Sequence, residues 1–265
     1  MDLQLAGRRA VVTGGSRGIG RAIARMLVLE GVDTIVCSRS EVKAREVAVE
    51  LGSLGTARVE PGVVELTSEE SIKAMVDSAA QQLGGVDIVV NSGAMVSGYL
   101  PEDFEHISDT LVLTAFEEKL IGSLRVCRHA VPHMRKGGWG RIISIGGHTS
   151  RRSGSIAAGA RNAALVNLTK NLGDALGKDG ITANVVHPAT TITETLRERM
   201  DQIASRRGTG VDEYLAQLST ENAIGRLVDA EEVAAVVTFL ASPLAAGITG
   251  EVIPVTGGAG KSVYY

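Results

Sequence analysis

The chain is poor in cysteine and in aromatic residues. It has two cysteines, Cys37 and Cys127, with no CxxC pair and no Cys/His spacing suited to zinc. This excludes a disulfide framework and a structural zinc site, and it fits a reducing, cytoplasmic setting. Aromatic residues make up only 3% of the chain, whereas 32 residues are glycine. We therefore expect an aliphatic core with many tight turns.

Long hydrophobic runs and a strong charge of one sign are also missing. No apolar run reaches the roughly 18 residues that a membrane-spanning helix needs, and the first residues, MDLQLAGRRAVVTGG, lack the apolar core of a signal peptide. The net charge of -3 leaves no basic footprint for nucleic acid. These absences argue against membrane and nucleic-acid partners and leave a small-molecule substrate.

What the chain does contain is an alternation of short apolar segments and helical patterns. Continuous apolar strands indicate burial on both faces, as in a parallel sheet covered by helices. Right-handed crossovers then predict an α/β fold, a Rossmann-like doubly wound sheet in one domain, residues 1–265. The predicted strands are 10–13, 34–38, 58–64, 86–91, 141–145, 182–187 and 251–255. The predicted helices are 20–30, 41–51, 69–83, 116–134, 156–176 and 230–240.

Residues 194–222 interrupt this alternation with a polar stretch before the last helix. We predict an irregular insert that forms a lid on the substrate side, because long connections in this architecture often lie over the site. Glu194 and Glu198, at helical spacing within it, are expected to be surface charges.

The first predicted strand ends in a glycine-rich turn, Thr13-Gly14-Gly15-Ser16-Arg17-Gly18-Ile19-Gly20. Gly14 permits the tight turn, Gly18 lets the backbone approach a pyrophosphate, and Gly20 allows close packing of helix on strand. The helix that follows offers free N–H groups at its start. Its place directly after the first strand favours a dinucleotide site.

The end of the second strand distinguishes between the two nicotinamide cofactors. An acidic residue there would bind the adenosine ribose hydroxyl and repel a 2′-phosphate. This chain has Ser38-Arg39-Ser40 instead. The planar fork of Arg39, joined by Arg17, suits a phosphate. We therefore expect NADP(H) rather than NAD(H).

Several motifs together resemble the short-chain dehydrogenase/reductase family. They are TGGSRGIG, Asn91-Ser92-Gly93-Ala94, and the segments 140–145, 163–170, 184–188 and 247–258. The resemblance implies a homotetramer or homodimer. It also implies a set of cofactor-binding residues: Gly14, Ser16, Arg17, Gly18, Ile19, Gly20, Ser38, Arg39, Glu65, Leu66, Asn91, Gly93, Asn162, Pro188, Ile192 and Thr193.

The family's catalytic residues are Asn, Ser, Tyr and Lys, and none of them is expected here. Matching the flanking motifs places Lys119 at the Asn, Gly147 at the Ser, Ala158 at the Tyr and Asn162 at the Lys. An alanine donates no proton, and losing a positioned general acid typically costs about 10²–10⁴-fold in rate. The usual mechanism of ketone reduction is therefore not expected.

Other side chains could take over the proton transfer. His148 follows the Ser position, Tyr99 is the nearest phenol, and Lys119 would restore a positive charge. Each also has a purely structural interpretation. His148 could be a loop histidine without a role, Tyr99 could cover an apolar rim, and Lys119 could extend to solvent. Arg151 and Arg152 suit an anionic substrate or a solvated pair. Arg161, one turn after Ala158, is expected to face away from the cofactor.

Three functions remain open from the sequence. The first is an NADP(H)-dependent oxidoreductase with an atypical active site, acting on a small carbonyl or enone. The second is a non-redox lyase, cyclase or isomerase on the same scaffold. The third is a catalytically inactive binding subunit, which could pair with an active paralogue in a hetero-oligomer. Fold does not decide among them, because function depends on the site.

Overall fold

The computed structural model describes residues 1–93 and 104–260. Its main feature is a seven-stranded sheet in the order β3-β2-β1-β4-β5-β6-β9, with every neighbouring pair parallel. The order reverses direction between β1 and β4, which is where doubly wound sheets bind ligands. The strands are β1 Arg9–Thr13, β2 Asp33–Ser38, β3 Val59–Val63, β4 Ile88–Asn91, β5 Gly140–Ile145, β6 Ile181–Pro188 and β9 Val252–Val255.

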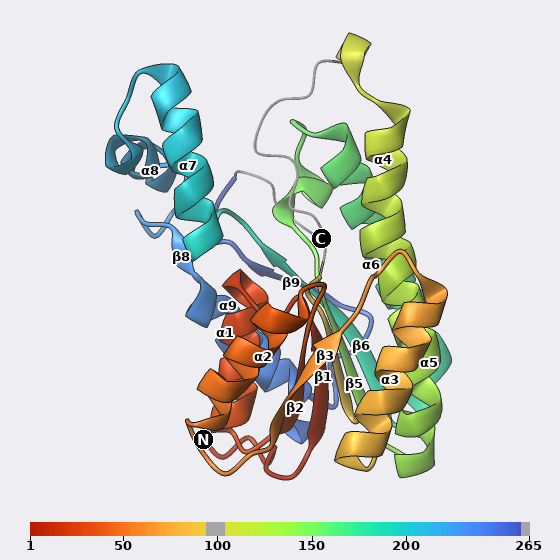
Figure 1. The fold of residues 1–265 in the computed structure, drawn as a ribbon. Helices are drawn as coiled ribbons and strands as arrows, with labels where there is room; N and C mark the ends of the chain where they lie inside the picture. Colours follow the sequence, from red (N-terminus) through yellow and green to blue (C-terminus); the bar gives the residue numbers. More distant parts are fainter. Residues whose placement is uncertain (94–103, 261–265) are drawn as a thin grey trace.

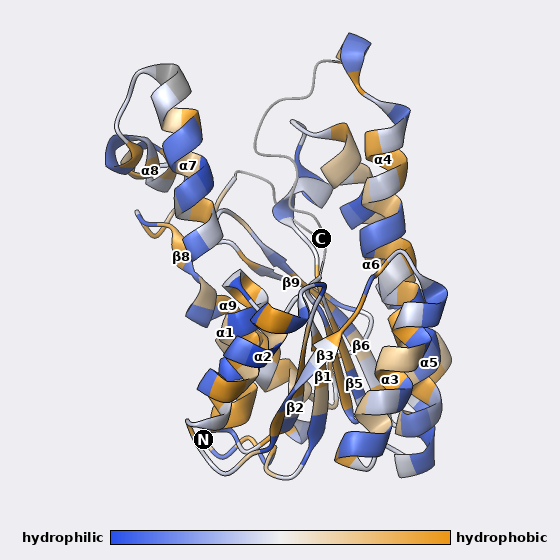
Figure 2. Cartoon of the chain, viewed as in Figure 1, coloured by the Kyte–Doolittle hydropathy of each residue, from blue (hydrophilic) through white to orange (hydrophobic). Residues whose placement is uncertain are grey.

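Helices cover both faces of this sheet (Figure 1). One apolar core joins the sheet to α1 (Gly18–Leu29), α2 (Glu41–Gly52) and α9 (Ala230–Ala241). A second core joins it to α3 (Glu69–Leu83) and α5 (Gly122–Gly137). The flanking helices carry both hydrophobic and hydrophilic residues (Figure 2), as expected for elements that bury one side only. Among the described residues, no helix is long and apolar enough to cross a membrane.

The structure confirms the predicted fold class and changes two elements. The helix expected over 116–134 begins earlier, as α4 (Asp109–Phe116), and continues through a π-helical segment, Glu117–Ile121, into α5. The apolar pattern over 116–134 predicts a regular α-helix and does not include the wider i→i+5 turn of the π-helical segment. The helix predicted over 156–176 is α6 (Ile156–Leu176), with the predicted bounds.

The expectation of an irregular insert at 194–222 was wrong. The segment forms α7 (Glu194–Arg207) and α8 (Val211–Ser219). Leu196, Met200 and Ile203 lie on one face of α7 and pack in a small core of their own. These three residues recur at helical spacing, a signal masked by the polar residues between them. Two short strands, β7 (Thr191–Ile192) and β8 (Val228–Asp229), pair at the base of this segment.

Candidate active site

A cavity of about 620 Å³ lies at the carboxyl ends of the strands. Its walls come from the glycine turn, the end of β2, the loop after β5, α6, and the α7–α8 segment. In Figure 1 the carboxyl ends of the strands lie at the top of the sheet, on the side from which α7 and α4 rise. Most of the residues predicted to bind a cofactor line it: Gly14, Ser16, Arg17, Gly18, Ile19, Gly20, Ser38, Arg39, Leu66, Gly93, Asn162, Pro188 and Thr193.

The glycine turn has the backbone geometry that a dinucleotide cradle needs. Gly14 has a φ of +65°, and a Cβ there would lie 2.8 Å from the Cα of Gly93. A Cβ on Gly20 would overlap the carbonyl oxygen of Gly14. Side chains are therefore excluded where helix, strand and turn meet, and the first residues of α1, Gly18 to Gly20, line the cavity.

Polar and cationic groups gather where β2 ends. The hydroxyls of Ser16 and Ser38 lie 3.1 Å apart, and Arg39 lines the cavity beside them. Lys43, which the sequence interpretation did not include, also lines it. Ser40 caps α2 by accepting from the amide of Lys43, so the lysine belongs to the first helical turn. None of the described residues lining this end is acidic.

Three predicted cofactor residues do not line the cavity. Glu65 accepts from the amide and hydroxyl of Thr67, so its carboxylate is engaged within its own turn. Asn91 is buried behind the cavity, and its Nδ2 lies 3.4 Å from the hydroxyl of Ser144. Ile192 is 46% exposed on β7. The side chains of these three residues point elsewhere than into the cavity in the described structure.

Lys119 enters the cavity from the π-helical segment. Its Nζ donates a 2.9 Å hydrogen bond to the carbonyl oxygen of Gly146, just after β5. The side chain is half-buried. Burial, with repulsion from Arg161 as the second cause, lowers the pKa of Lys119 to about 7. An ammonium with this pKa gives up and regains a proton near neutral pH.

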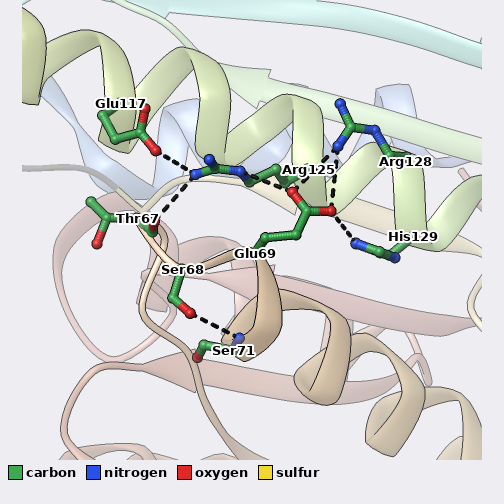
Figure 3. Close-up of polar contacts among 8 residues, drawn as sticks. All are labelled: Thr67, Ser68, Glu69, Ser71, Glu117, Arg125, Arg128 and His129. Atoms are coloured by element: carbon green, nitrogen blue, oxygen red, sulfur yellow. Dashed lines mark hydrogen bonds and ion pairs between the residues drawn. The ribbon is translucent and has the colours of Figure 1, made fainter.

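A network of charges outside the cavity fixes the π-helical segment in place. Glu69, at the start of α3, pairs with Arg125, Arg128 and His129 of α5. Arg125 also pairs with Glu117, the first residue of the π-helical segment (Figure 3). The His129 side chain, with the two arginines, holds the pKa of Glu69 below its usual range. The segment that carries Lys119 is thus tied to α3 on one side and to Gly146 on the other.

Gly147 and Asn162 fit one another closely. A Cβ on Gly147 would lie 2.7 Å from the Nδ2 of Asn162. That amide donates a 2.8 Å bond to the hydroxyl of Thr149, and its buried Oδ1 has no hydrogen-bond partner in the described structure. Ala158 is buried one turn earlier on α6, with its amide bonded to Ser155, and it does not line the cavity.

Two histidines lie against the loop after β5. His148 begins the 3₁₀ turn His148–Arg151 and lines the cavity; burial, with Arg152 and Arg151, lowers its pKa. His187 at the end of β6 is buried, and its Nδ1 lies 3.0 Å from the hydroxyl of Ser150. Burial, reinforced by Lys119, lowers the pKa of His187 to about 3, so the ring is neutral. Tyr99, the third predicted proton-transfer residue, lies outside the described residues.

Arg161 was expected to face away from the cofactor, and that expectation was wrong. Its side chain is buried, with 4% exposure, and it lines the cavity near Lys119. Arg152 lines the cavity nearer its rim, with Glu221 of the α7–α8 segment 3.8 Å away. The sequence interpretation counted turns from Ala158 but could not tell which side of α6 faces the loop after β5.

The start of α7 touches the glycine turn. The Glu194 carboxylate accepts a 2.8 Å hydrogen bond from the amide of Gly18. Glu194 was expected to be a surface charge, and the structure gives it a contact with the glycine turn as well. It occupies an amide at the start of α1, a position where helix amides favour an anion.

Comparison with known proteins agrees with this geometry. The family model described as enoyl-(acyl carrier protein) reductase matches residues 14–260. The 3-oxoacyl-(acyl-carrier-protein) reductase FabG of Vibrio cholerae is 33% identical over 97% of this chain and 98% of its own length. The chain belongs to the short-chain dehydrogenase/reductase family, a family of oxidoreductases.

Solved structures show the same likeness. L-sorbose reductase from Gluconobacter frateurii, in complex with NADPH and L-sorbose, superimposes with a TM-score of 0.94 at 28% identity, covering 99% of this chain and 100% of that one. A single-residue variant of actinorhodin polyketide ketoreductase, solved with NADPH, gives a TM-score of 0.87 at 30% identity, over 95% and 96% of the two chains.

Proposed function

We propose that this protein is an NADP(H)-dependent oxidoreductase that reduces a carbonyl or enone group of a small molecule, with Lys119 as the proton donor. The observation that carries the proposal is the half-buried Lys119 ammonium. It reaches the same cavity as the glycine turn and bonds to Gly146. A cofactor cradle and a titratable acid thus meet at one edge of the sheet.

The residues around the cavity fit NADP(H). Side chains are excluded at Gly14 and Gly20, and the first residues of α1 line the space where a pyrophosphate would bind. Arg39, Arg17 and Lys43 would hold the 2′-phosphate at the end of β2. Two similar reductases have been solved with NADPH, which supports the same choice here. NADPH supplies a hydride when it is bound.

The family's usual proton donor has no counterpart in this proposal. Ala158 takes the place of the tyrosine and Asn162 that of the lysine, while Gly147 and Lys119 take those of the serine and asparagine. The close fit of Gly147 against Asn162 supports a coordinated replacement, because a serine at 147 would meet the Asn162 amide. The Asn162 side chain would then bond to Thr149 and, through its free Oδ1, to a ribose hydroxyl.

Lys119 would perform the step that the tyrosine performs elsewhere. As negative charge develops on the carbonyl oxygen, the ammonium donates one proton to it. The neutral amine that remains keeps its place near Gly146 and takes a proton from water. A pKa of about 7 suits this task, since the best general acid titrates near the working pH. His148, buried in the same wall, would position the substrate rather than donate.

The α7–α8 segment, with residues up to 222, would act as the lid. Met200, Tyr214 and Leu218 present apolar surface to the cavity. The bond from Gly18 to Glu194 would hold this lid against the glycine turn until a pyrophosphate displaces the carboxylate. Closing over the substrate would exclude water from the developing charge.

The direct test is NADPH consumption at 340 nm across a panel of ketones, aldehydes and enones, with NADPH binding measured in parallel by titration. We expect binding and turnover of at least one substrate class. Binding without turnover across the panel would favour a binding subunit. Product formed without any nucleotide would instead favour a non-redox enzyme.

A further inference from the structure

The substrate end of the cavity has an unusual concentration of positive charge. Lys119 from the π-helical segment and Arg161 from α6 both line it, and each lies within the electrostatic reach of the other. Arg152 adds a third cation nearer the rim, where the Glu221 carboxylate lies 3.8 Å from it. None of these three is a position at which the family resemblance places a cation. The family lysine position holds Asn162.

The neighbouring side chains respond to this charge. Burial is the largest cause of the lowered pKa values of His148 and His187, and the neighbouring cations Arg151, Arg152 and Lys119 act in the same direction. For Lys119 too, burial comes first and the repulsion from Arg161 adds to it. The described contact of Lys119 is a carbonyl oxygen, which neutralises no charge. A positive, water-restricted pocket attracts an anion.

We infer that the substrate carries a carboxylate that the Arg161 guanidinium holds beside Lys119, so that this protein reduces small oxo acids rather than neutral ketones. The inference rests on the proposed function and specifies its substrate class. A guanidinium matches a carboxylate through two parallel N–H···O bonds. With the carboxylate at Arg161, the carbonyl of the same small molecule would lie in the cavity that Lys119 also lines.

A carboxylate bound at Arg161 would also change the pKa of the proton donor, Lys119. Among the described residues, Arg161 from α6 and neutral His187 from β6 interact electrostatically with Lys119, and burial followed by repulsion from Arg161 lowers its pKa. A negative charge on Arg161 offsets that repulsion and keeps the lysine protonated to higher pH. We expect the basic limb of the kcat profile to lie at higher pH for an oxo acid than for its methyl ester.

The first experiment needs no variant. The complex of the protein with NADP⁺ is titrated with benzoate and with benzamide, which have the same shape but differ in charge. Turnover is then measured for 2-, 4- and 5-oxo acids, each beside its methyl ester. We expect benzoate to bind and benzamide not to, and kcat/KM to favour the acid of at least one pair by roughly 10- to 100-fold. Equal use of acids and esters, with no benzoate binding, would overturn the inference while leaving the reductase proposal intact.

The second experiment assigns the role to Arg161. Arg161→Met keeps the aliphatic stem and removes the charge, Arg161→Lys keeps the charge, and Arg25→Met removes an exposed arginine on α1 outside the cavity. We expect Arg161→Met to abolish the preference for acid over ester, Arg161→Lys to restore part of it, and Arg25→Met to change nothing. Loss of NADPH affinity in Arg161→Met, with the acid preference kept, would contradict the inference and make Arg161 a cofactor residue. Benzoate binding without any turnover would support the anion site and count against the reductase proposal.

Discussion

The two ends of the cavity differ in how far the chain keeps the family's residues. At the cofactor end, the glycine turn, the end of β2 and Thr193 line the cavity as the resemblance implies. At the chemical end, Lys119, Gly147 and Asn162 form a different arrangement, bonded to Gly146 and Thr149. The cofactor end depends mainly on backbone geometry, whereas the chemical end depends on the chemistry of its side chains. Under the proposed function, the scaffold keeps its nucleotide site while the proton donor comes from the π-helical segment instead of α6.

The largest effect is expected at the chemical end, where Lys119→Met should lower kcat by about 10²–10⁴-fold, the usual cost of losing a positioned general acid. NADPH affinity should stay close to that of the wild type. Steady-state kinetics and cofactor titration check the two halves separately. Lys136→Met, an exposed lysine on α5, serves as the control. A Lys119→Met enzyme with full kcat would break the comparison, because proton transfer would then lie elsewhere.

The cofactor end is tested by reversing the charge of Arg39. Arg39→Glu should weaken NADPH binding by roughly 10- to 100-fold, since a charged hydrogen bond to the 2′-phosphate is replaced by repulsion. NADH binding should change much less. The control is Arg25→Glu. If Arg39→Glu binds NADPH as tightly as the wild type does, Arg17 and Lys43 hold the phosphate without it.

The fit between Gly147 and Asn162 gives a stability prediction. Gly147→Ser should lower the free energy of unfolding by about 1–3 kcal/mol, because its Cβ would lie 2.7 Å from the Asn162 amide. Asn162→Ala in the same chain should recover part of that loss. Chemical denaturation of both single variants and the double variant measures the coupling. Gly137→Ser, where nothing lies within 4 Å, is the matched control.

The pH dependence of stability should reveal Lys119 directly. Its pKa is about 7 in the folded chain against the ordinary 10.5, so the unfolded chain binds more protons between these values. The contribution of Lys119 to stability is therefore complete above pH 10.5 and is lost as pH falls towards 7. Lys119→Met should gain stability over the wild type near pH 7, and the gain should shrink towards pH 10. A difference that does not vary with pH would mean an ordinary lysine.

A smaller effect is expected at the contact between lid and glycine turn. Glu194→Gln removes a negative charge from the amide of Gly18, where a pyrophosphate would bind. NADPH should bind a few-fold more tightly, as measured by titration. Glu198→Gln on the same helix is the control. Weaker binding in Glu194→Gln would show that the carboxylate supports the cofactor rather than competing with it.

The sequence predicted the sheet well, and most of the residues it proposed for the cofactor line the cavity, because both features depend on backbone patterns. The apolar strands and the glycines Gly14 and Gly20 leave clear traces in the order of residues. The prediction from sequence failed where the direction of a side chain or the packing of a segment decides its role. Arg161 was assigned to the outside of α6, and the helices of 194–222 were hidden among polar residues. The segment that carries Lys119 was expected to be regular α-helix, and the structure has a π-helical turn there. Such features depend on contacts between elements far apart in the chain.

The most direct test of the account is an isothermal titration of the purified protein with NADPH, with NADH run beside it. The account predicts saturable binding of NADPH that is clearly tighter than that of NADH, because Arg39, Arg17 and Lys43 surround the site of the 2′-phosphate. Binding of neither nucleotide would contradict it. The replacements at the chemical end would then have disabled the cofactor end as well, and the protein would not be a reductase.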